Sequence, residues 1–439
     1  MKSFIRKGVA FAIFTMTMGT AYSQLKITAE VRPRAEYRHG FKTLPTTDMD
    51  NAFFVDQRTR LNVKYQKDRI KFYVSLQDVR TWGSQKQLVG NEDFGVSIHE
   101  AWGSAQIFDN WALKFGRQEL VYDDSRIFGN VGWAQQARSH DALLFKYGKE
   151  KLKLDIGGAF NQNSPKLNTT SYTVGGSYKS LQYLWANYKF NSSFSASVLA
   201  MSVGQQVNYV NANGVDRYQD NYTLTAGTRL VYKKNKFGLG FNGYYQLGST
   251  NTWPARDVSA YNLCLDLSYK VADPLKLTVG FEMLSGNSQT DVSTSYVETN
   301  HAFTPYFGTN HKFNGYMDYF YVGNHIGNVG LNDIYLRLDY KHDKFTAGVT
   351  GHAFMANTDV LDVPEFVSTG NLSAMSPYMG AEIDLFGGFD LAPGAKCKIG
   401  YSHLIGTSTM EAVKGGDMTE VANWGYVMFI IKPTLFEQK

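Results

Sequence analysis

The stretch NYTLTAGTRLVYKKNKFGLGFNGYYQLG, residues 221–248, contains the pattern that decides the fold. In its first half Tyr222, Leu224 and Ala226 alternate with Thr223 and Thr225, and the second half alternates in the same way. Four polar residues, KKNK, separate the halves. Because successive side chains of a strand point to opposite faces, the pattern predicts two hairpin-paired strands, each with one apolar and one polar face.

The same unit recurs along the chain. Short polar connections lie at residues 66–69, 108–111, 148–151, 189–193, 233–236, 271–274 and 341–344, and longer Gly/Asn/Ser-rich connections lie between them. Four of the short ones follow a Tyr-Lys pair, at Tyr188, Tyr232, Tyr269 and Tyr340. Short turns at one end, long loops at the other and tyrosines at one height are typical of an outer-membrane barrel with an aromatic girdle.

We therefore predict an all-β protein, a transmembrane antiparallel β-barrel of about 18 strands with short periplasmic turns and long extracellular loops. The expected strands are residues 25–38, 52–65, 70–82, 96–108, 111–119, 139–147, 152–161, 181–190, 194–205, 221–232, 237–248, 260–270, 275–286, 332–340, 345–355, 377–386, 396–406 and 421–433. The alternative, a soluble β-sandwich, needs a packed inner face, whereas one face here is polar along nearly every strand.

The first 23 residues predict a secretory signal peptide. A basic start with Lys2, Arg6 and Lys7 precedes an apolar run at residues 8–19, which is too short to span a bilayer as a helix. Small residues before position 24 suit a cleavage site, so we expect residues 24–439 to form the barrel in the outer membrane of a Gram-negative cell.

Composition agrees with a membrane barrel. Aromatic residues make up 15% of the chain, with 28 Tyr and 29 Phe, and Tyr suits a membrane interface. A net charge of +5 is too diffuse to indicate a nucleic-acid partner. Cys264 and Cys397 fall on opposite faces of their strands, so we expect two free thiols.

The stretch KFGRQELVYDDSRIFGNVGWAQQARSHDA, residues 114–142, breaks the regular pattern. A strand enters it and another leaves it, and the charges between are too many for a lipid-facing surface. We expect residues 117–138 to fold into the pore as a constriction. Its arginines are expected to contact the solute and its carboxylates to hold the arginines; these residues are Arg117, Arg126 and Arg138, with Glu119, Asp123, Asp124 and Asp141.

Two other chemistries are open to this stretch. Asp123 and Asp124 could bind calcium, although they lack the spaced oxygen ligands of a loop site. His140 and Asp141 could form a hydrolytic pair, although neighbours in a strand point to opposite faces. We expect no metal, no cofactor and no catalytic residue.

The first two strands carry a second charged set. One face of the first strand holds charges of both signs, and one face of the second holds only basic residues; the two sets are Glu30, Arg32, Arg34, Glu36 and Arg38, and then Arg58, Arg60 and Lys64. Facing a lumen, Arg32, Arg34, Arg58 and Arg60 form a positive wall that favours anions. They could equally pair with the glutamates as a structural ladder, and both can hold.

A resemblance to a known family enters with the block GRQELVYDDSRIFGNVGWAQQARSHDAL. It resembles the signature of the alginate-export family of outer-membrane barrels, at Gly116, Arg117, Gln118, Glu119, Leu120, Tyr122, Asp123, Asp124, Arg126, Gly129, Asn130, Trp133, Gln135, Gln136, Arg138 and Asp141. VRTWGS, HEAW and the segment FGTNHKFNGYMDYF at residues 307–320 also look like family features, the last of the Bacteroidetes type. The resemblance implies an eighteen-stranded barrel with an Arg-lined constriction that passes a negatively charged polysaccharide.

The longest connection, residues 286–330, contains three histidines, but their spacing indicates no metal site. Its aromatic residues could stack on sugar rings above the pore; we expect them instead to pack the loop onto itself.

Together these patterns predict a monomeric porin in contact with outer-membrane lipid. It would pass an anionic small molecule or polysaccharide, by passive diffusion or export, through an Arg-lined pore. Because the mature chain starts at a strand, we expect no plug or energy-coupling domain. The alternatives are a barrel hydrolase, which needs Ser/His or Asp/His groups converging at the rim, and an adhesin that uses the long loops.

The first test concerns export. N-terminal sequencing of protein purified from outer membranes should begin at Gln24, because the signal peptide is removed on secretion. A chain that still begins at Met1 would contradict the prediction.

Overall fold

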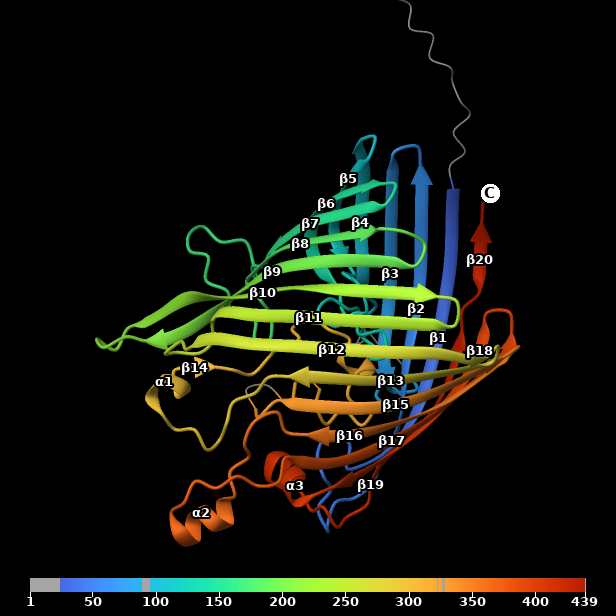
Figure 1. Ribbon diagram of the computed structural model, residues 1–439. Helices are drawn as coiled ribbons and strands as arrows, with labels where there is room; N and C mark the ends of the chain where they lie inside the picture. Colours follow the sequence, from blue (N-terminus) through green and yellow to red (C-terminus); the bar gives the residue numbers. More distant parts are fainter. Residues whose placement is uncertain (1–23, 89–94, 322, 326–327, 439) are drawn as a thin grey trace, which may run out of the picture.

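The computed structural model describes residues 24–88, 95–321, 323–325 and 328–438, so the predicted signal peptide lies outside the described residues. The chain forms one antiparallel sheet that closes on itself, because β1 pairs with β2 on one side and with β19 on the other (Figure 1).

Eighteen long strands form the barrel wall. They are β1 (Gln24–His39), β2 (Ala52–Lys67), β3 (Ile70–Thr81), β4 (Ser97–Phe108), β5 (Trp111–Gln118), β6 (His140–Lys149), β7 (Leu152–Phe160), β8 (Ser180–Lys189), β9 (Phe194–Val210), β10 (Asp216–Lys234), β11 (Phe237–Ser249), β12 (Asp257–Ala272), β13 (Leu275–Leu284), β15 (Leu331–His342), β16 (Phe345–Met355), β17 (Tyr378–Ala392), β18 (Ala395–Gly406) and β19 (Ala422–Ile431). Two short strands are added: β14 (Thr299–Asn300) pairs with the start of β12, and β20 (Thr434–Glu437) pairs with the start of β1.

The predicted barrel and its strand number are confirmed, and each predicted strand overlaps one wall strand. The largest differences are extensions. The hairpin of β9 and β10 continues to Val210 and Asp216, and β17 continues to Ala392 rather than ending at residue 386. Glycines 387 and 388 stay within the strand, in register with β16 and β18, so the turn at that end is only residues 393–394.

The exposure of apolar and polar side chains in the wall is the reverse of that in a soluble protein. On β12, Leu263, Leu265 and Leu267 are 41%, 40% and 40% exposed, whereas Asn262 and Cys264 are 0% and 5% exposed. The apolar side chains point outward, where hydrocarbon accepts them, and the polar ones point into the lumen. Both cysteines are free, as predicted.

The two ends of the barrel differ. The short turns and both ends of the described chain lie at one end, and the long connections lie at the other (Figure 1). The long connections contain α1 (Thr294–Val297), α2 (Val363–Thr369) and α3 (Ser408–Lys414). Within the described residues, no helix is long and apolar enough to cross a bilayer.

Glycines facing large rings shape the inner wall. In five cross-strand pairs of the described inner wall an aromatic ring lies over the glycine opposite it, where an added Cβ would overlap ring atoms; the pairs are Gly157–Tyr183, Gly227–Tyr244, Gly280–Tyr335, Gly348–Phe386 and Gly400–Tyr426. A ring that covers a bare glycine supplies the packing that the glycine lacks. This arrangement accounts for part of the high content of both residue types.

The pair at β18 and β19 can be tested by substitution. Gly400→Ala should lower the free energy of unfolding by about 1–3 kcal/mol, because the new methyl group displaces the Tyr426 ring. Urea titration of the folded barrel measures the change. The matched control is Gly351→Ala, since a Cβ at Gly351 meets no atom within 4 Å. Equal effects of the two substitutions would contradict the packing role.

Candidate functional site

The connection between β5 and β6, residues 119–139, leaves the wall and crosses the barrel interior; we call it the first lumen loop. Its Asp124 forms an ion pair with Arg229 of β10 (2.5 Å), and its Arg126 forms one with Glu282 of β13 (2.7 Å). Its far part contacts β1, which lies about half-way round the closed sheet from β10. A segment that touches strands on opposite sides of a barrel must cross the lumen.

A second segment, residues 285–330, joins it there; we call it the second lumen loop. The Gly129 N–H donates to the Phe307 carbonyl (2.8 Å), and the Thr309 N–H donates to the Ser125 carbonyl (2.9 Å). The Phe128 and Phe307 rings stack with centroids 5.6 Å apart. The sequence placed this connection above the pore. Its aromatic residues do pack, as expected, but they do so inside the barrel against the first lumen loop.

Arg126 is at the centre of this packing. Arg126 and Glu282 are each only 2% exposed. The guanidinium also donates to Asn314 (3.1 Å), which in turn donates to Glu282 (2.8 Å), and it lies 4.6 Å from the centroid of the Phe313 ring. The prediction that Arg126 contacts the solute is therefore wrong. A buried charge needs this full set of partners, and Arg126 uses it to join both lumen loops to the wall.

Arg32 and Arg34 hold the far part of the first lumen loop against β1. Arg32 donates to the Gly132 carbonyl (2.7 Å) and to Gln135 Oε1 (3.0 Å). Arg34 donates to the Trp133 carbonyl (2.7 Å), and its guanidinium lies 4.1 Å from the centroid of the Trp133 ring. Both arginines face the lumen but are covered by the loop, so they anchor it.

The other charged residues of β1 and β2 fit both predicted arrangements: some form ion pairs, as in a ladder, and some arginines have no carboxylate partner among the described residues. Arg58 pairs with Glu30 (2.5 Å) and Arg34 with Glu36 (2.5 Å), as a structural ladder requires. Arg58 is buried, so its predicted place on the open pore surface is also wrong. Arg60 is half-buried and donates to an amide oxygen of β3.

Arg117 and Asp141 lie on the outer surface of the barrel. Their ion pair (2.9 Å) joins neighbouring positions of β5 and β6, on the same face as the exposed Phe115 and Leu143. Side chains that are 43% and 63% exposed on this face do not line the pore. Asp141 holds an arginine, but it does so on the outer face, so the predicted place of both residues in the pore is wrong. The buried His140 points to the opposite face, as alternation predicted, so it forms no hydrolytic pair with Asp141.

The acidic pair of the first lumen loop binds adjoining strands of the wall, since Ser197 of β9 lies opposite Arg229 of β10. Asp123 accepts hydrogen bonds from Trp185 Nε1 (3.1 Å) and Ser197 Oγ (2.6 Å), whereas Asp124 binds Arg229. Burial raises the pKa of Asp123 above its usual value. Both carboxylates hold the loop through partners in the wall rather than through the loop's own arginines. Among the described residues, neither carboxylate belongs to a group of three or more clustered metal-ligating side chains.

The third predicted arginine, Arg138, joins the two loops. Its guanidinium donates to the Gly308 carbonyl (3.3 Å), and burial lowers its pKa. It is half-buried, and its contacts are structural.

Between the lumen loops and the short turns lie two adjoining chambers that share Asp123. They measure about 950 Å³ and about 630 Å³. Eight Lys or Arg and seven Asp or Glu line the larger one, so its formal charge is nearly balanced. Its basic residues, most of which the sequence analysis did not single out, are Arg229, Lys233, Lys236, Lys270, Lys276, Lys312, Arg337 and Lys341.

The unbalanced charge lies on the other side of the barrel, around β1. Five lumen-facing basic residues on β1, β2, β5 and β18 have no carboxylate within 4 Å in the described part of the chain; they are Arg32, Arg60, Lys64, Lys114 and Lys398. Lys398 could not be assigned to this wall from the sequence, because β18 comes near β1 only when the barrel closes.

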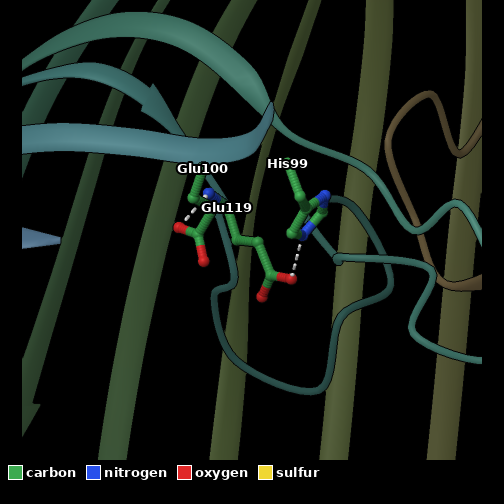
Figure 2. Close-up of side chains that lie close together, drawn as sticks. All are labelled: His99, Glu100 and Glu119. Atoms are coloured by element: carbon green, nitrogen blue, oxygen red, sulfur yellow. Dashed lines mark hydrogen bonds and ion pairs between the residues drawn. The ribbon is translucent and has the colours of Figure 1, made fainter. Parts of the chain in front are cut away.

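One further cluster faces the lumen beside the first lumen loop. His99 Nε2 lies 2.8 Å from Glu119 Oε1, and Glu100 Oε2 accepts the backbone N–H of Glu119 (3.0 Å). Figure 2 shows the His99 and Glu119 side chains pointing toward each other, with Glu100 beside them. Burial opposes ionisation of Glu119, but hydrogen bonds from His99 and Asn130 outweigh it, so the pKa of Glu119 lies below its usual value.

An eighteen-stranded barrel with an apolar outer face, a polar lumen and short turns at one end defines an outer-membrane porin. The family model described as alginate export matches residues 23–422. The chain belongs to the alginate export family.

Solved structures support the fold. The chain is similar to Pseudomonas aeruginosa OccK3 (OpdO), with 12% identity over 94% of this chain and 96% of that one and a TM-score of 0.60. It is also similar to Acinetobacter baumannii OccAB1 (12% identity, 94% and 97% coverage, TM-score 0.59) and to the P. aeruginosa outer membrane protein OprD (13% identity, 94% and 94% coverage, TM-score 0.57). Comparison with curated protein sequences gives no match.

The buried ion pair supplies a test of how the lumen loops are held. Arg126→Gln should lower the free energy of unfolding by about 3–5 kcal/mol, because the Glu282 carboxylate stays buried without its partner. The double variant Arg126→Gln/Glu282→Gln should recover much of this loss, since no charge is then left unpaired. Urea unfolding followed by tryptophan fluorescence measures both. A double variant no more stable than the single one would contradict this role.

Proposed function

We propose that this protein is a passive channel for anionic solutes across the outer membrane. The observation that carries the proposal is the group of five unpaired basic side chains around β1. Its lumen-facing acidic neighbours without an ion pair to Lys or Arg, within the described residues, are Asp56, Glu100 and Glu119, so the excess charge is positive. Positive side chains that line a pore raise the local concentration of anions and lower the barrier to their passage.

The first lumen loop covers Arg32, so the other four basic residues of the group are the ones that attract anions. Arg60 is half-buried, and Lys64 and Lys398 are exposed to the lumen. Lys114 lies 4.0 Å from the centroid of the Trp102 ring, which holds its ammonium group at the wall. An anion that moves along β1 therefore meets several cations in succession, without one fixed binding site.

The lumen loops favour small solutes over a wide polymer. Ion pairs and backbone hydrogen bonds hold both loops across the interior, and the tie through Arg126 is fully buried. Carboxylate-bearing small molecules fit the chambers that remain. A uronate polymer, which the family description suggests, would have to pass as a single extended chain.

Two further observations support a non-enzymatic, single-chain channel. His140 is buried and hydrogen-bonds Tyr178 (2.9 Å), on the face opposite Asp141, so the hydrolytic pair that was considered from the sequence is not assembled. The sheet closes within one chain, so a lumen needs no second copy.

Part of the positive charge around β1 can be reversed by substitution. Arg60→Glu/Lys64→Glu should lower the anion-to-cation permeability ratio by about threefold or more, because two lumen cations become anions. Reversal potentials of the purified barrel in planar bilayers under a salt gradient measure the ratio.

The control is Arg217→Glu at the exposed tip of the β9–β10 hairpin, which should leave the ratio unchanged. An unchanged ratio in the double variant would contradict the proposal. Block of the current by uronate oligomers, but not by neutral oligosaccharides of equal length, would extend the substrate class to the polymer.

A further inference from the structure

A β-bulge in β4 places two consecutive side chains on the lumen side. Ser75 of β3 pairs with Glu100, but the next residue, Leu76, pairs with Ile98, so His99 is an extra residue in β4. Ile98 is exposed on the outer face, whereas His99 is 4% exposed and faces the lumen together with Glu100. Bulges of this kind redirect side chains and recur beside functional sites.

The bulge brings three metal-ligating groups together. His99 and Glu100 from β4 and Glu119 from the start of the first lumen loop each offer one ligand atom, and these atoms lie within 4.8 Å of one another (Figure 2). In the described part of the chain, neither carboxylate has a Lys or Arg nitrogen within 4 Å. Within the described residues, Arg60 and Lys114 act on the two carboxylates from farther away, and the His99 imidazole lies in direct contact with Glu119.

Neighbouring groups orient the two carboxylates. Asn130 Nδ2 donates to Glu119 Oε2 (2.7 Å), and Trp102 Nε1 donates to Glu100 Oε2 (3.2 Å). These bonds leave Glu119 Oε1 directed at His99, and Glu100 Oε1 has no hydrogen bond in the described residues. Outer partners of this kind hold ligands in place in metal sites.

We propose that His99, Glu100 and Glu119 form a binding site for a divalent transition metal ion such as Zn²⁺. Imidazole nitrogens and carboxylate oxygens are both ligands of this ion, and water can complete the shell around three protein ligands. The double charge of the ion balances the two carboxylates. The direct contact between His99 and Glu119 holds the ligands together without the ion, and the ion would replace that hydrogen bond with two stronger ties.

A bound ion would fasten the first lumen loop to β4. Glu119 is the first residue of that loop, and it also binds Asn130 from the middle of the loop. The ion would thus restrain the segment that narrows the lumen. This consequence rests on the proposed channel function, whereas metal binding itself does not.

Calorimetry on the metal-free, purified full chain in detergent tests the site with ZnCl₂ alone. The wild type should bind one Zn²⁺ per chain. His99→Gln, Glu100→Gln and Glu119→Gln should each weaken binding about tenfold or more, because each removes one ligand. The matched control is His342→Gln, which removes a histidine from the exposed His342–Asp343 pair in a short turn and should leave binding unchanged.

Two results would overturn the site: no saturable binding by the wild type, or full binding by all three glutamine variants. The three variants keep the size of the side chains, and circular dichroism shows whether each is folded. A single folded variant with undiminished affinity would remove that residue from the ligand set.

Single-channel recording tests the consequence for the loop. Zn²⁺ should reduce current fluctuations of the wild type, EDTA should restore them, and His99→Gln should respond to neither. Binding by calorimetry together with an unchanged current would overturn the restraint of the loop, and absence of any channel current would count against the proposed function but not against the metal site.

Discussion

A sheet in hydrocarbon cannot leave an edge unpaired, because each free N–H or C=O group there costs several kcal/mol. The pairing of β1 with β19 meets this constraint, and the rest of the structure depends on it. Closure fixes which strands become neighbours, which faces meet lipid and how wide the interior is. It also brings the two ends of the described residues together at one rim, where β20 completes the pairing of β1.

An interior of eighteen strands is too wide for side chains alone to fill. Here two long connections fold inward and meet, and their polar backbone is satisfied by hydrogen bonds between the loops and from the arginines of β1. The charged residues of the wall thus divide into two groups. One group, with Arg32, Arg34 and Arg126, is buried and holds the loops. The other, with Lys64 and Lys398, is exposed to the lumen.

Most of the fold follows from local patterns. Alternation with a period of two and the recurring short turns gave the strands, their number and their outward faces, because both signals depend only on neighbouring residues. The same alternation contains the correct position of Arg117: Trp111, Leu113 and Phe115 point to lipid, so Arg117 points outward as well. The prediction for Arg117 is wrong because it follows the charge of the side chain and not the face that the strand imposes.

Other parts of the site could not be read from the sequence. Arg126 meets Asn314 across 188 positions and Arg32 meets Gln135 across 103, and no local pattern encodes such contacts. Regular alternation would place His99 and Glu100 on opposite faces of β4. The bulge at His99 interrupts the alternation, so both side chains face the lumen and form one cluster. The most direct measurement is the reversal potential of the wild-type protein in a planar bilayer under a KCl gradient. If the channel is anion-selective, discrete current steps should appear, and their reversal potential should be shifted from zero towards the equilibrium potential of chloride. A cation-selective current, or no current from folded protein, would contradict the proposed function.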